Sequence, residues 1–252
     1  MNRMLGKLPA IFPSNAPRMD GQKLMARQAP PKLIRDHIDP GPQMDDNDNI
    51  GDCVPVAIAN IARARARLDG YTLTIPTAKT VGFYSQVTGY DPSNPKSDGG
   101  TDEASACTAL ARDGFDIGQQ ERLYALWGSI DHQDLNGLRL VCSEINPPLL
   151  GVGLALADQA LGVWDTTTAG DQTPNSWGGH GVGLWDYDGI ELDSLVTIIT
   201  WGSVKQKATW RWLLARMDEA HALSFRQLRK ADVLGVNYDT WEADCSSYLQ
   251  SA

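Results

Sequence analysis

The chain has 252 residues, 42% hydrophobic and 21% charged, an ordinary globular composition with room for one sizeable domain or two small ones. Its formal net charge of −9 disfavours a basic face for nucleic acid, so we expect no nucleic-acid partner. No apolar run reaches the ~18 residues of a membrane span, and Lys7, Pro9 and Pro13 interrupt the first residues. Neither a membrane span nor a secretory signal is therefore predicted.

Residues 1–44 differ from the rest of the chain. Prolines recur through them with scattered basic residues, and no helical or strand period survives. We therefore predict an extended arm rather than part of a compact core. Such an arm is ordered only if it is pinned on its own globule or on neighbouring subunits, and we expect neighbouring subunits of a large assembly.

Residues 45–133 show mainly helical patterns. A helix is predicted over 52–68, with Asp52 at its N-cap position. Two further helices are predicted over 77–88 and 101–113, the last opening with acidic residues in its first turn.

The second half of the chain is richer in strand patterns. The predicted elements are a helix over 134–144, strands over 149–156, 180–187 and 195–201, and a helix over 207–222. Helices followed mostly by strands are typical of an α+β fold with two lobes. We place a helical lobe at about 45–133, a sheet lobe at about 134–222 and a C-terminal tail at 223–252.

The four cysteines are scattered, and none forms a C-x-x-C pair. This spacing favours free thiols in a reducing compartment over a disulfide framework or a zinc site, and we expect no metal or cofactor. Cys107 and Cys142 lie in helical patterns and are predicted to be small buried residues.

Cys53 stands apart because it lies at the start of the predicted helix over 52–68. The helix dipole and the free backbone N–H groups favour a thiolate at that position. His180 opens an apolar strand pattern far downstream, and a cysteine with a distant histidine is the arrangement of a cysteine nucleophile. The alternatives are a buried cysteine at a helix start and a core histidine.

Other candidates receive simpler interpretations. The acidic loop over 45–52 is interpreted as solvated, although its carboxylates would raise the pKa of Cys53. The remaining histidines, His37, His132 and His221, are assigned to surface or helix positions. Three tryptophans are expected in the core or between the lobes: Trp201, Trp210 and Trp212.

A resemblance rests on strings that occur in one order along the chain. They are Asp48-Asn49-Ile50-Gly51-Asp52-Cys53, Val87-Thr88-Gly89-Tyr90-Asp91-Pro92, Ser176-Trp177-Gly178-Gly179-His180-Gly181-Val182 and Ile199-Thr200-Trp201-Gly202. In this order the strings resemble papain-like cysteine peptidases, specifically a group of papain-like proteins from bacteriophages and bacteria. The match covers about residues 45–222.

The resemblance implies roles for particular residues. Cys53 would be the nucleophile and His180 its base, forming a thiolate–imidazolium pair. Asn47 would take the oxyanion-hole position, with Asn49 as a nearby alternative. The substrate cleft would be lined by Asp98, Gly99, Gly100 and Trp201.

The sequence departs from the papain-like pattern where an asparagine should orient the histidine. The aligned residue is Ile199, which cannot form a hydrogen bond. Thr200 follows it and is expected to point to the opposite face of the strand. Asn175 precedes the histidine and is interpreted as a decoy, the alternative being that it folds back onto His180.

Three functions follow as hypotheses. The first is a papain-like cysteine peptidase that is associated with a phage virion and acts on protein or peptide. Under this hypothesis Cys53 and His180 take the catalytic positions, and whether Cys53 turns over substrate stays open. The second is a catalytically degenerate virion structural protein, either a capsid decoration or a tail component. The third is a peptidoglycan amide hydrolase. We expect a virion protein made in the host cytoplasm, or otherwise a cytoplasmic one. An open cleft would favour catalysis, and a cleft filled by the arm would favour the structural role.

Overall fold

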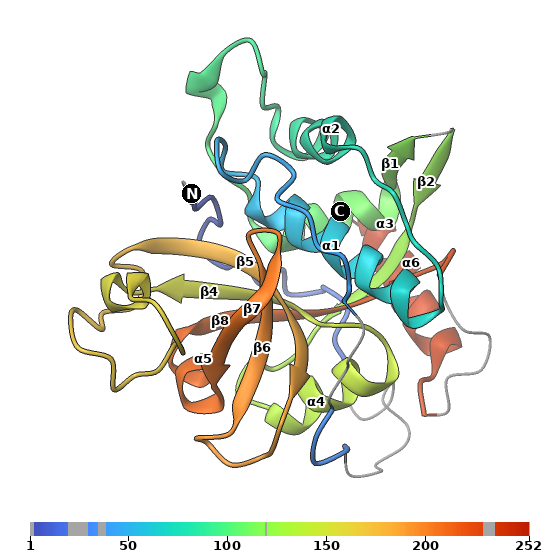
Figure 1. Cartoon of the computed structure of the whole chain (residues 1–252). Helices are drawn as coiled ribbons and strands as arrows, with labels where there is room; N and C mark the ends of the chain where they lie inside the picture. The colour runs from blue at the N-terminus through green and yellow to red at the C-terminus, as the bar shows by residue number, and fades with distance from the viewer. Residues whose placement is uncertain (1–2, 20–29, 35–38, 119, 229–234, 252) are drawn as a thin grey trace.

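A computed structural model describes residues 3–19, 30–34, 39–118, 120–228 and 235–251. The helices α1 to α3 and a small hairpin lie against one side of a twisted antiparallel sheet (Figure 1). The helices are α1 (Cys53–Leu68), α2 (Thr77–Thr88), α3 (Glu103–Arg112), α4 (Leu135–Glu144), α5 (Trp210–Arg216) and α6 (Tyr238–Ser251), with short 3-10 turns η1 (Pro95–Ser97) and η2 (Leu156–Gln159).

The main sheet has six strands in the order β3-β8-β4-β5-β6-β7, and every neighbouring pair is antiparallel. Its strands are β3 (Ala125–Ser129), β4 (Leu149–Leu154), β5 (Gly178–Tyr187), β6 (Leu195–Thr200), β7 (Ser203–Thr209) and β8 (Met217–Phe225). The strands β1 (Phe115–Gly118) and β2 (Glu121–Leu123) form the separate hairpin. The predicted α+β fold with two lobes is confirmed in this arrangement.

Helix α1 lies directly on strand β5, and glycines in the strand allow the close approach. A Cβ at Gly181 would meet Val54 Cγ2 at 3.0 Å, and one at Gly183 would meet Ile61 Cγ1 at 3.3 Å. The alternation of glycine with larger residues along β5 therefore brings the start of α1 against the strand that carries His180.

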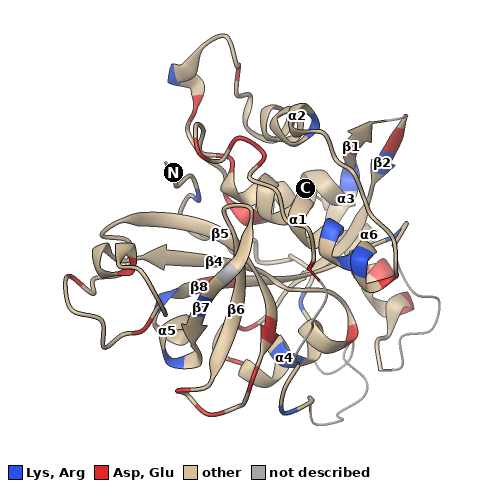
Figure 2. Ribbon diagram, in the orientation of Figure 1, with Lys and Arg blue, Asp and Glu red and all other residues tan. Residues whose placement is uncertain are grey.

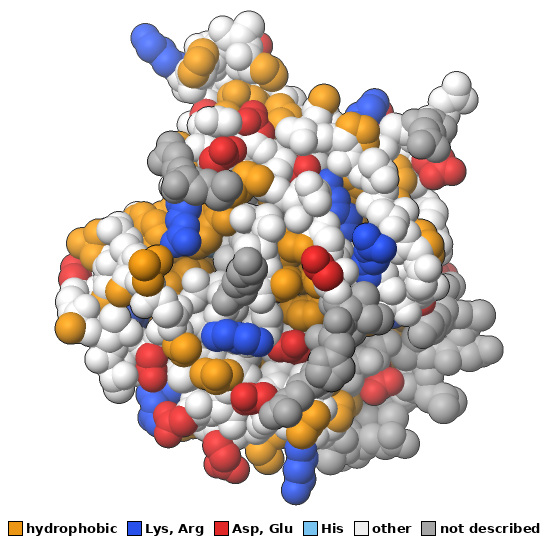
Figure 3. Space-filling model, in the orientation of Figure 1, with side chains coloured by type: hydrophobic (Ala, Val, Ile, Leu, Met, Phe, Trp, Pro, Cys, Tyr) orange, Lys and Arg blue, Asp and Glu red, His pale blue; other side chains and the backbone are white. Residues whose placement is uncertain are grey.

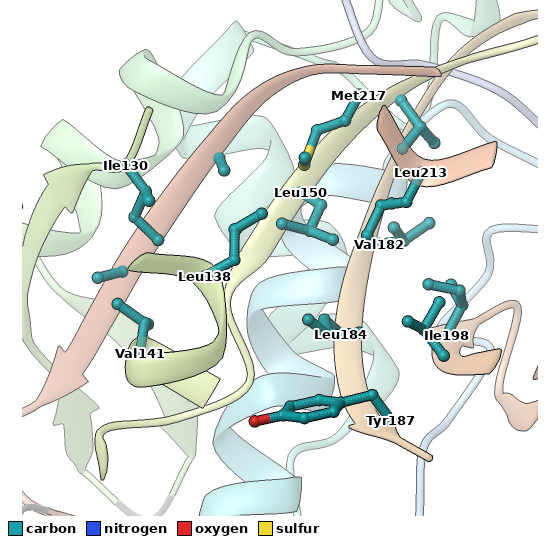
Figure 4. Packing of buried hydrophobic residues seen from close by; sticks show 14 of the residues in the cluster. Ile130, Leu138, Val141, Leu150, Val182, Leu184, Tyr187, Ile198, Leu213 and Met217 are labelled. Carbon is teal, nitrogen blue, oxygen red and sulfur yellow. The ribbon is translucent and has the colours of Figure 1, made fainter. Parts of the chain in front are cut away.

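The other face of the sheet buries a second apolar core. Side chains from α4, such as Leu138 and Val141, pack with Leu150 of β4 and Val182 and Leu184 of β5 (Figure 4). Five buried tryptophans complete this core, and Trp164 stacks on Trp212 at 4.7 Å between ring centroids. The expectation of buried tryptophans at 210 and 212 is confirmed, since both are fully buried.

The predicted helix over 207–222 is confirmed only over Trp210–Arg216, and its two ends are wrong. The chain completes β7, makes the short helix α5 and enters β8 at Met217. Thr209 accepts a hydrogen bond from the Trp212 N–H and caps α5, which accounts for its start. Strand β8 is central and buried on both faces, so its sequence has no clean alternation to distinguish it from a buried helix.

The predicted lobe boundaries also need correction. Strand β3 comes from the segment assigned to the helical lobe, yet it pairs with β8 in the main sheet. The segment predicted as a tail contains helix α6, whose Trp241 donates to the Trp127 carbonyl at 2.8 Å. Within the described ranges, no helix is long and apolar enough to cross a membrane. Acidic and basic side chains are interspersed over the face shown in Figure 3.

Candidate active site

Cys53 is the first residue of α1 and is almost completely buried, with 1% of its surface exposed. Its Sγ accepts a hydrogen bond from the Gly181 N–H at 3.4 Å, across the α1–β5 contact. Burial raises the pKa of the Cys53 thiol to about 11, against the opposing effect of hydrogen bonds from the Gly181 and Gly6 N–H groups. The helix start alone therefore does not produce a thiolate in this state.

His180 lies on β5 immediately before Gly181, the residue whose backbone N–H contacts Cys53 Sγ. Its Nε2 is 2.7 Å from the Thr200 hydroxyl, and its ring stacks on Trp201 at 4.3 Å. Its Nδ1 has no hydrogen-bond partner among the described residues. Burial, assisted by the charge of Arg3, lowers the pKa of His180 to about 3, so the imidazole is neutral.

The expectation that Ile199 takes the position that orients the histidine is corrected by this geometry. The Thr200 hydroxyl contacts His180, whereas Ile199 is buried with Ala64 and Trp185. The two side chains point to opposite faces of β6, as expected, and the face that meets the imidazole is that of Thr200. Thr200 therefore supplies the polar contact to the imidazole that Ile199 lacks.

The predicted oxyanion residues are engaged in the loop that precedes α1. The Asn47 amide donates to the Ile50 carbonyl at 3.1 Å. The Asn49 amide donates to the Asp46 carboxylate at 2.6 Å. Both contacts stabilise the shape of the loop, and the role of Asn47 toward an oxyanion stays a prediction.

The loop after α2 supports the other side of the cleft. The Asp98 carboxylate accepts hydrogen bonds from the Gly51 N–H at 3.0 Å and from the Tyr84 hydroxyl at 2.6 Å. The same hydroxyl accepts from the Gly100 N–H at 2.8 Å. Asp98 thus ties this loop to the turn before Cys53, while Gly99 has open space beside it.

The beginning of the arm, residues 3–8, lies in the cleft beside Cys53. The Lys7 N–H donates to the Gly179 carbonyl at 3.1 Å, the Thr101 N–H donates to the Gly6 carbonyl at 2.7 Å, and the Leu8 N–H donates to the Thr101 carbonyl at 3.0 Å. The fit is close, because a Cβ on Gly100 would meet the Gly6 oxygen at 2.2 Å.

Neighbouring arm residues cover Trp201. Its Nε1 lies 3.4 Å from the Met4 carbonyl oxygen, and the Arg3 guanidinium lies 4.6 Å from the ring centre. This part of the arm is thus pinned on its own globule, whereas residues 20–29 and 35–38, with His37, lie outside the described residues.

Comparison with known proteins agrees with this architecture. No family model matches the chain, and no curated protein matches it by sequence. Solved structures do match, among them xylellain, a cysteine protease from Xylella fastidiosa, at a TM-score of 0.64 and 15% identity over 89% of this chain and 98% of that one.

The chain has the papain-like fold. Two further matches carry the same fold. Procathepsin B S9 from Trypanosoma congolense has a TM-score of 0.59 and 12% identity, over 89% of this chain and 87% of that one. Procathepsin L2 from the larval midgut of Tenebrio molitor has a TM-score of 0.57 and 15% identity, over 88% and 78%.

Beside the cleft, the papain-like domain buries a cluster that the sequence interpretation missed. Glu103, Glu219 and His221 place ligand-type atoms within 4.8 Å of one another, a set that could hold a metal ion. The Lys7 ammonium lies 3.0 Å from Glu219 Oε1 and is the cation placed there.

The assignment of His221 to a surface or helix position is wrong, because His221 is buried in this cluster. Glu219 and His221 are two residues apart on β8, which puts both on one face, but only once the segment is identified as a strand.

A cavity of about 450 Å³ lies beside Thr200 and Trp201, the two residues that contact His180. Thr200, Trp201 and Arg3 contribute to its lining, with Met44 and Lys207.

The acidic loop is not solvated as expected, although Figure 2 shows its acidic residues gathered where the chain approaches α1. The buried Asp45 carboxylate pairs with Arg63 of α1 at 2.6 Å and accepts from the Thr80 hydroxyl. Asp52 occupies the N-cap position but makes no cap hydrogen bond, which corrects its predicted role. It is fully buried, and this burial raises its pKa to about 8.

Replacing Asp52 by asparagine is expected to stabilise the protein at alkaline pH and to flatten its stability profile. The folded-state pKa of Asp52 lies above the unfolded value, so its favourable contribution is complete below about pH 4 and is lost as pH rises to about 8. Urea unfolding at pH 5 and pH 9 measures the change. We expect a gain of about 1–3 kcal/mol for D52N at pH 9 relative to pH 5. An equal effect at both values would contradict the assignment.

Proposed function

We propose that the protein is a cysteine peptidase whose resting state is latent because its own arm lies in the active-site cleft. The observation that carries the proposal is the hydrogen bond between His180 Nε2 and Thr200, at the strand that meets Cys53. It leaves Nδ1 as the free nitrogen of the imidazole. A nucleophile, a base and a group that orients the base are thus held on three rigid elements.

The reaction follows from these positions. The thiol proton of Cys53 passes to His180, and the thiolate attacks a peptide carbonyl to form a tetrahedral intermediate. Its oxyanion would be stabilised by the Cys53 N–H at the start of α1, with the Asn47 amide as the second donor in our proposal. The protonated imidazole gives its proton to the leaving amine, which leaves an acyl thioester. A water then attacks the thioester, passes its proton through His180 and regenerates the thiol.

The latency proposal explains the otherwise unfavourable pKa values. With the arm in place, the pKa of Cys53 is about 11 and that of His180 is about 3, so neither group is charged at neutral pH. Burial is the main cause for both groups, and the arm contributes to it. Moving residues 3–8 out of the cleft would admit water and substrate together, so both pKa values would move toward their ordinary range.

Hydrolysis of unfolded casein by the full-length G6A variant tests the proposal. Gly6 is chosen because an added methyl cannot fit its place in the cleft. We expect hydrolysis by G6A and none by G6A/C53A or G6A/H180A. G6A/T200V should be slower by ~10-fold or more, because valine keeps the shape but cannot orient the imidazole. A G6A chain that is folded and inert, with an accessible Cys53, would reject the peptidase.

The second candidate function is that of a structural protein in a virion, which uses the fold as a scaffold. The observation that favours it is that the arm fills the cleft. We propose, from the resemblance of the ordered sequence strings to the phage group, that the chain occupies a phage particle and that the rest of its arm reaches neighbouring subunits. In the scaffold case, deletion of residues 1–44 abolishes incorporation into particles and C53A leaves it intact. Incorporation without the arm would contradict that role.

A further inference from the structure

The Lys7 side chain of the arm enters a buried pocket that the proposed reaction does not use. Its Nζ lies 3.0 Å from Glu219 Oε1 and 3.0 Å from Asp218 Oδ1, and it donates to the Leu8 carbonyl at 3.0 Å. The Lys7 side chain is 1% exposed and that of Glu219 is fully buried. A long cationic side chain from the arm is thus enclosed within the globule.

The pocket has room for such a side chain because of one glycine. A Cβ at Gly151 of β4 would meet Lys7 Cε at 2.1 Å and Glu219 Cγ at 2.6 Å. Any larger residue at this position would close the pocket. Gly151 also lies at the irregular step in the β4–β8 pairing, where the two strands bring Glu219 beside it.

The floor of the pocket holds two buried carboxyl groups, Glu103 and Glu219. Glu103 is fully buried, and neither of its carboxylate oxygens has a hydrogen-bond partner among the described residues. His221 Nε2 lies 3.2 Å from Glu219 and 3.6 Å from Glu103. Burial raises the pKa of Glu103 well above its ordinary value, and the nearby Glu219 charge adds to the effect. The buried Glu219 carboxylate, 3.0 Å from Lys7 Nζ, is the group for which a cation offsets the desolvation.

The backbone around Lys7 is held as an extended peptide. Its N–H donates to the carbonyl of Gly179, the residue before His180, and Thr101 bonds Gly6 and Leu8 on the opposite side. Main-chain hydrogen bonds of this kind recognise a peptide of any sequence, while side-chain pockets provide the selectivity. A substrate strand that used the same donors and acceptors would place a side chain in the Lys7 pocket, within a few residues of Cys53.

We propose that this pocket selects a lysine or arginine side chain of the substrate close to the scissile bond, and that Lys7 of the arm is its resident stand-in. The inference rests on the proposed function, because it assigns the substrate class of that site. The arm would then block the cleft by presenting the side chain that the enzyme prefers, and a basic substrate would compete directly with it.

Binding by the pocket is tested without turnover, on the full-length K7A variant. We expect K7A to melt at a lower temperature than the wild type and n-butylammonium to restore part of the loss. The neutral n-butanol should not do so, and the wild type should not respond to either compound. Restoration by Zn²⁺ but not by n-butylammonium would overturn the proposal in favour of a metal site at Glu103, Glu219 and His221. No restoration by any of these would overturn it as well.

Selectivity is tested by mass-spectrometric profiling of a peptide library cleaved by the full-length G6A variant. We expect Lys and Arg to be enriched at one position within three residues of the cleavage site. G6A/E219Q should lower the ratio of lysine to norleucine peptides by ~10–100-fold, the loss of a charged hydrogen bond. G6A/G151V should lower cleavage of basic peptides by filling the pocket, and G6A/E121Q, at an exposed glutamate, should leave the profile unchanged.

The outcomes separate the two proposals. If G6A cleaves peptides without a preference for Lys or Arg, or if the preference persists in both E219Q and G151V, the proposed selectivity of the pocket is wrong. The peptidase proposal is not affected by either result. A different result would reject the peptidase proposal and, with it, the substrate selectivity. In that result G6A cleaves nothing although its Cys53 is reactive, while n-butylammonium still raises the melting temperature of K7A.

Discussion

Replacing Gly6 by alanine is expected to increase the alkylation rate of Cys53 by iodoacetamide by at least ~20-fold at pH 7. The added Cβ would lie 1.8 Å from the Gly51 oxygen, and Asp98 holds Gly51 in place, so the arm has to move. A fall in the thiol pKa from about 11 to ~8.5 raises the thiolate fraction by ~300-fold, and lower nucleophilicity removes ~10–15-fold of that gain. Easier access of the reagent adds to the result.

The control for this experiment is G99A in the same cleft. Gly99 has no atom within 4 Å of an added Cβ, so the arm should stay and the rate should remain within about twofold of the wild type. Peptide mapping by mass spectrometry distinguishes Cys53 from the buried Cys107. Equal labelling of Cys53 in G6A and wild type would show that the arm does not protect the thiol.

Replacing Asp45 by asparagine should lower the free energy of unfolding by about 3–5 kcal/mol, the cost of leaving a buried charge without its partner. Arg63 of α1 is buried, and its ion pair with Asp45 measures 2.6 Å. Asparagine keeps the size of the side chain and tolerates the left-handed backbone at this position, where φ is 48°. The loss therefore reports the charge, and urea unfolding measures it.

The matched control is D193N, which removes a carboxylate from an exposed ion pair with Arg211 at the same 2.6 Å distance. Exposed pairs of this kind contribute up to ~1 kcal/mol, so D193N should be close to the wild type. A D45N variant as stable as D193N would mean that Arg63 is solvated and that the acidic loop is not anchored to α1 as described.

Sequence patterns predicted the parts of the site that depend on local signals. The run after Cys53 has the apolar content and the end signals of a helix, and α1 spans Cys53–Leu68 as expected within one residue. The strand that begins near His180 was also predicted from its apolar pattern. Between them, these elements carry the proposed nucleophile and base.

The errors arose where tertiary structure overrides the local pattern. Thr200 rather than Ile199 faces His180, because the pairing of β6 with β5 decides which face of β6 meets the histidine. Asp45 and Asp52 occur in a string that resembles a solvated loop, yet α1 and the cleft loops enclose both. The pocket combines Lys7, Glu103 and Glu219, which lie far apart in the sequence, so no local motif marked it.

The arm posed a different problem. Its prolines correctly indicated extended chain, but an extended segment has no periodicity from which its docking site can be predicted. Its placement depends on glycines elsewhere, since Gly51 and Gly100 leave space for the Gly6 backbone. The composition of the arm therefore could not distinguish its own cleft from a neighbouring subunit.

The most direct test of the peptidase proposal is detection of the covalent intermediate on Cys53. The full-length G6A variant is mixed with a lysine p-nitrophenyl ester, quenched in acid within seconds and analysed by peptide mass spectrometry. The proposal predicts one acyl group, in thioester linkage, on the peptide that carries Cys53, and none in G6A/H180A. An acyl group on Cys142, or equal acylation of Cys53 with and without His180, would contradict a Cys53–His180 active site.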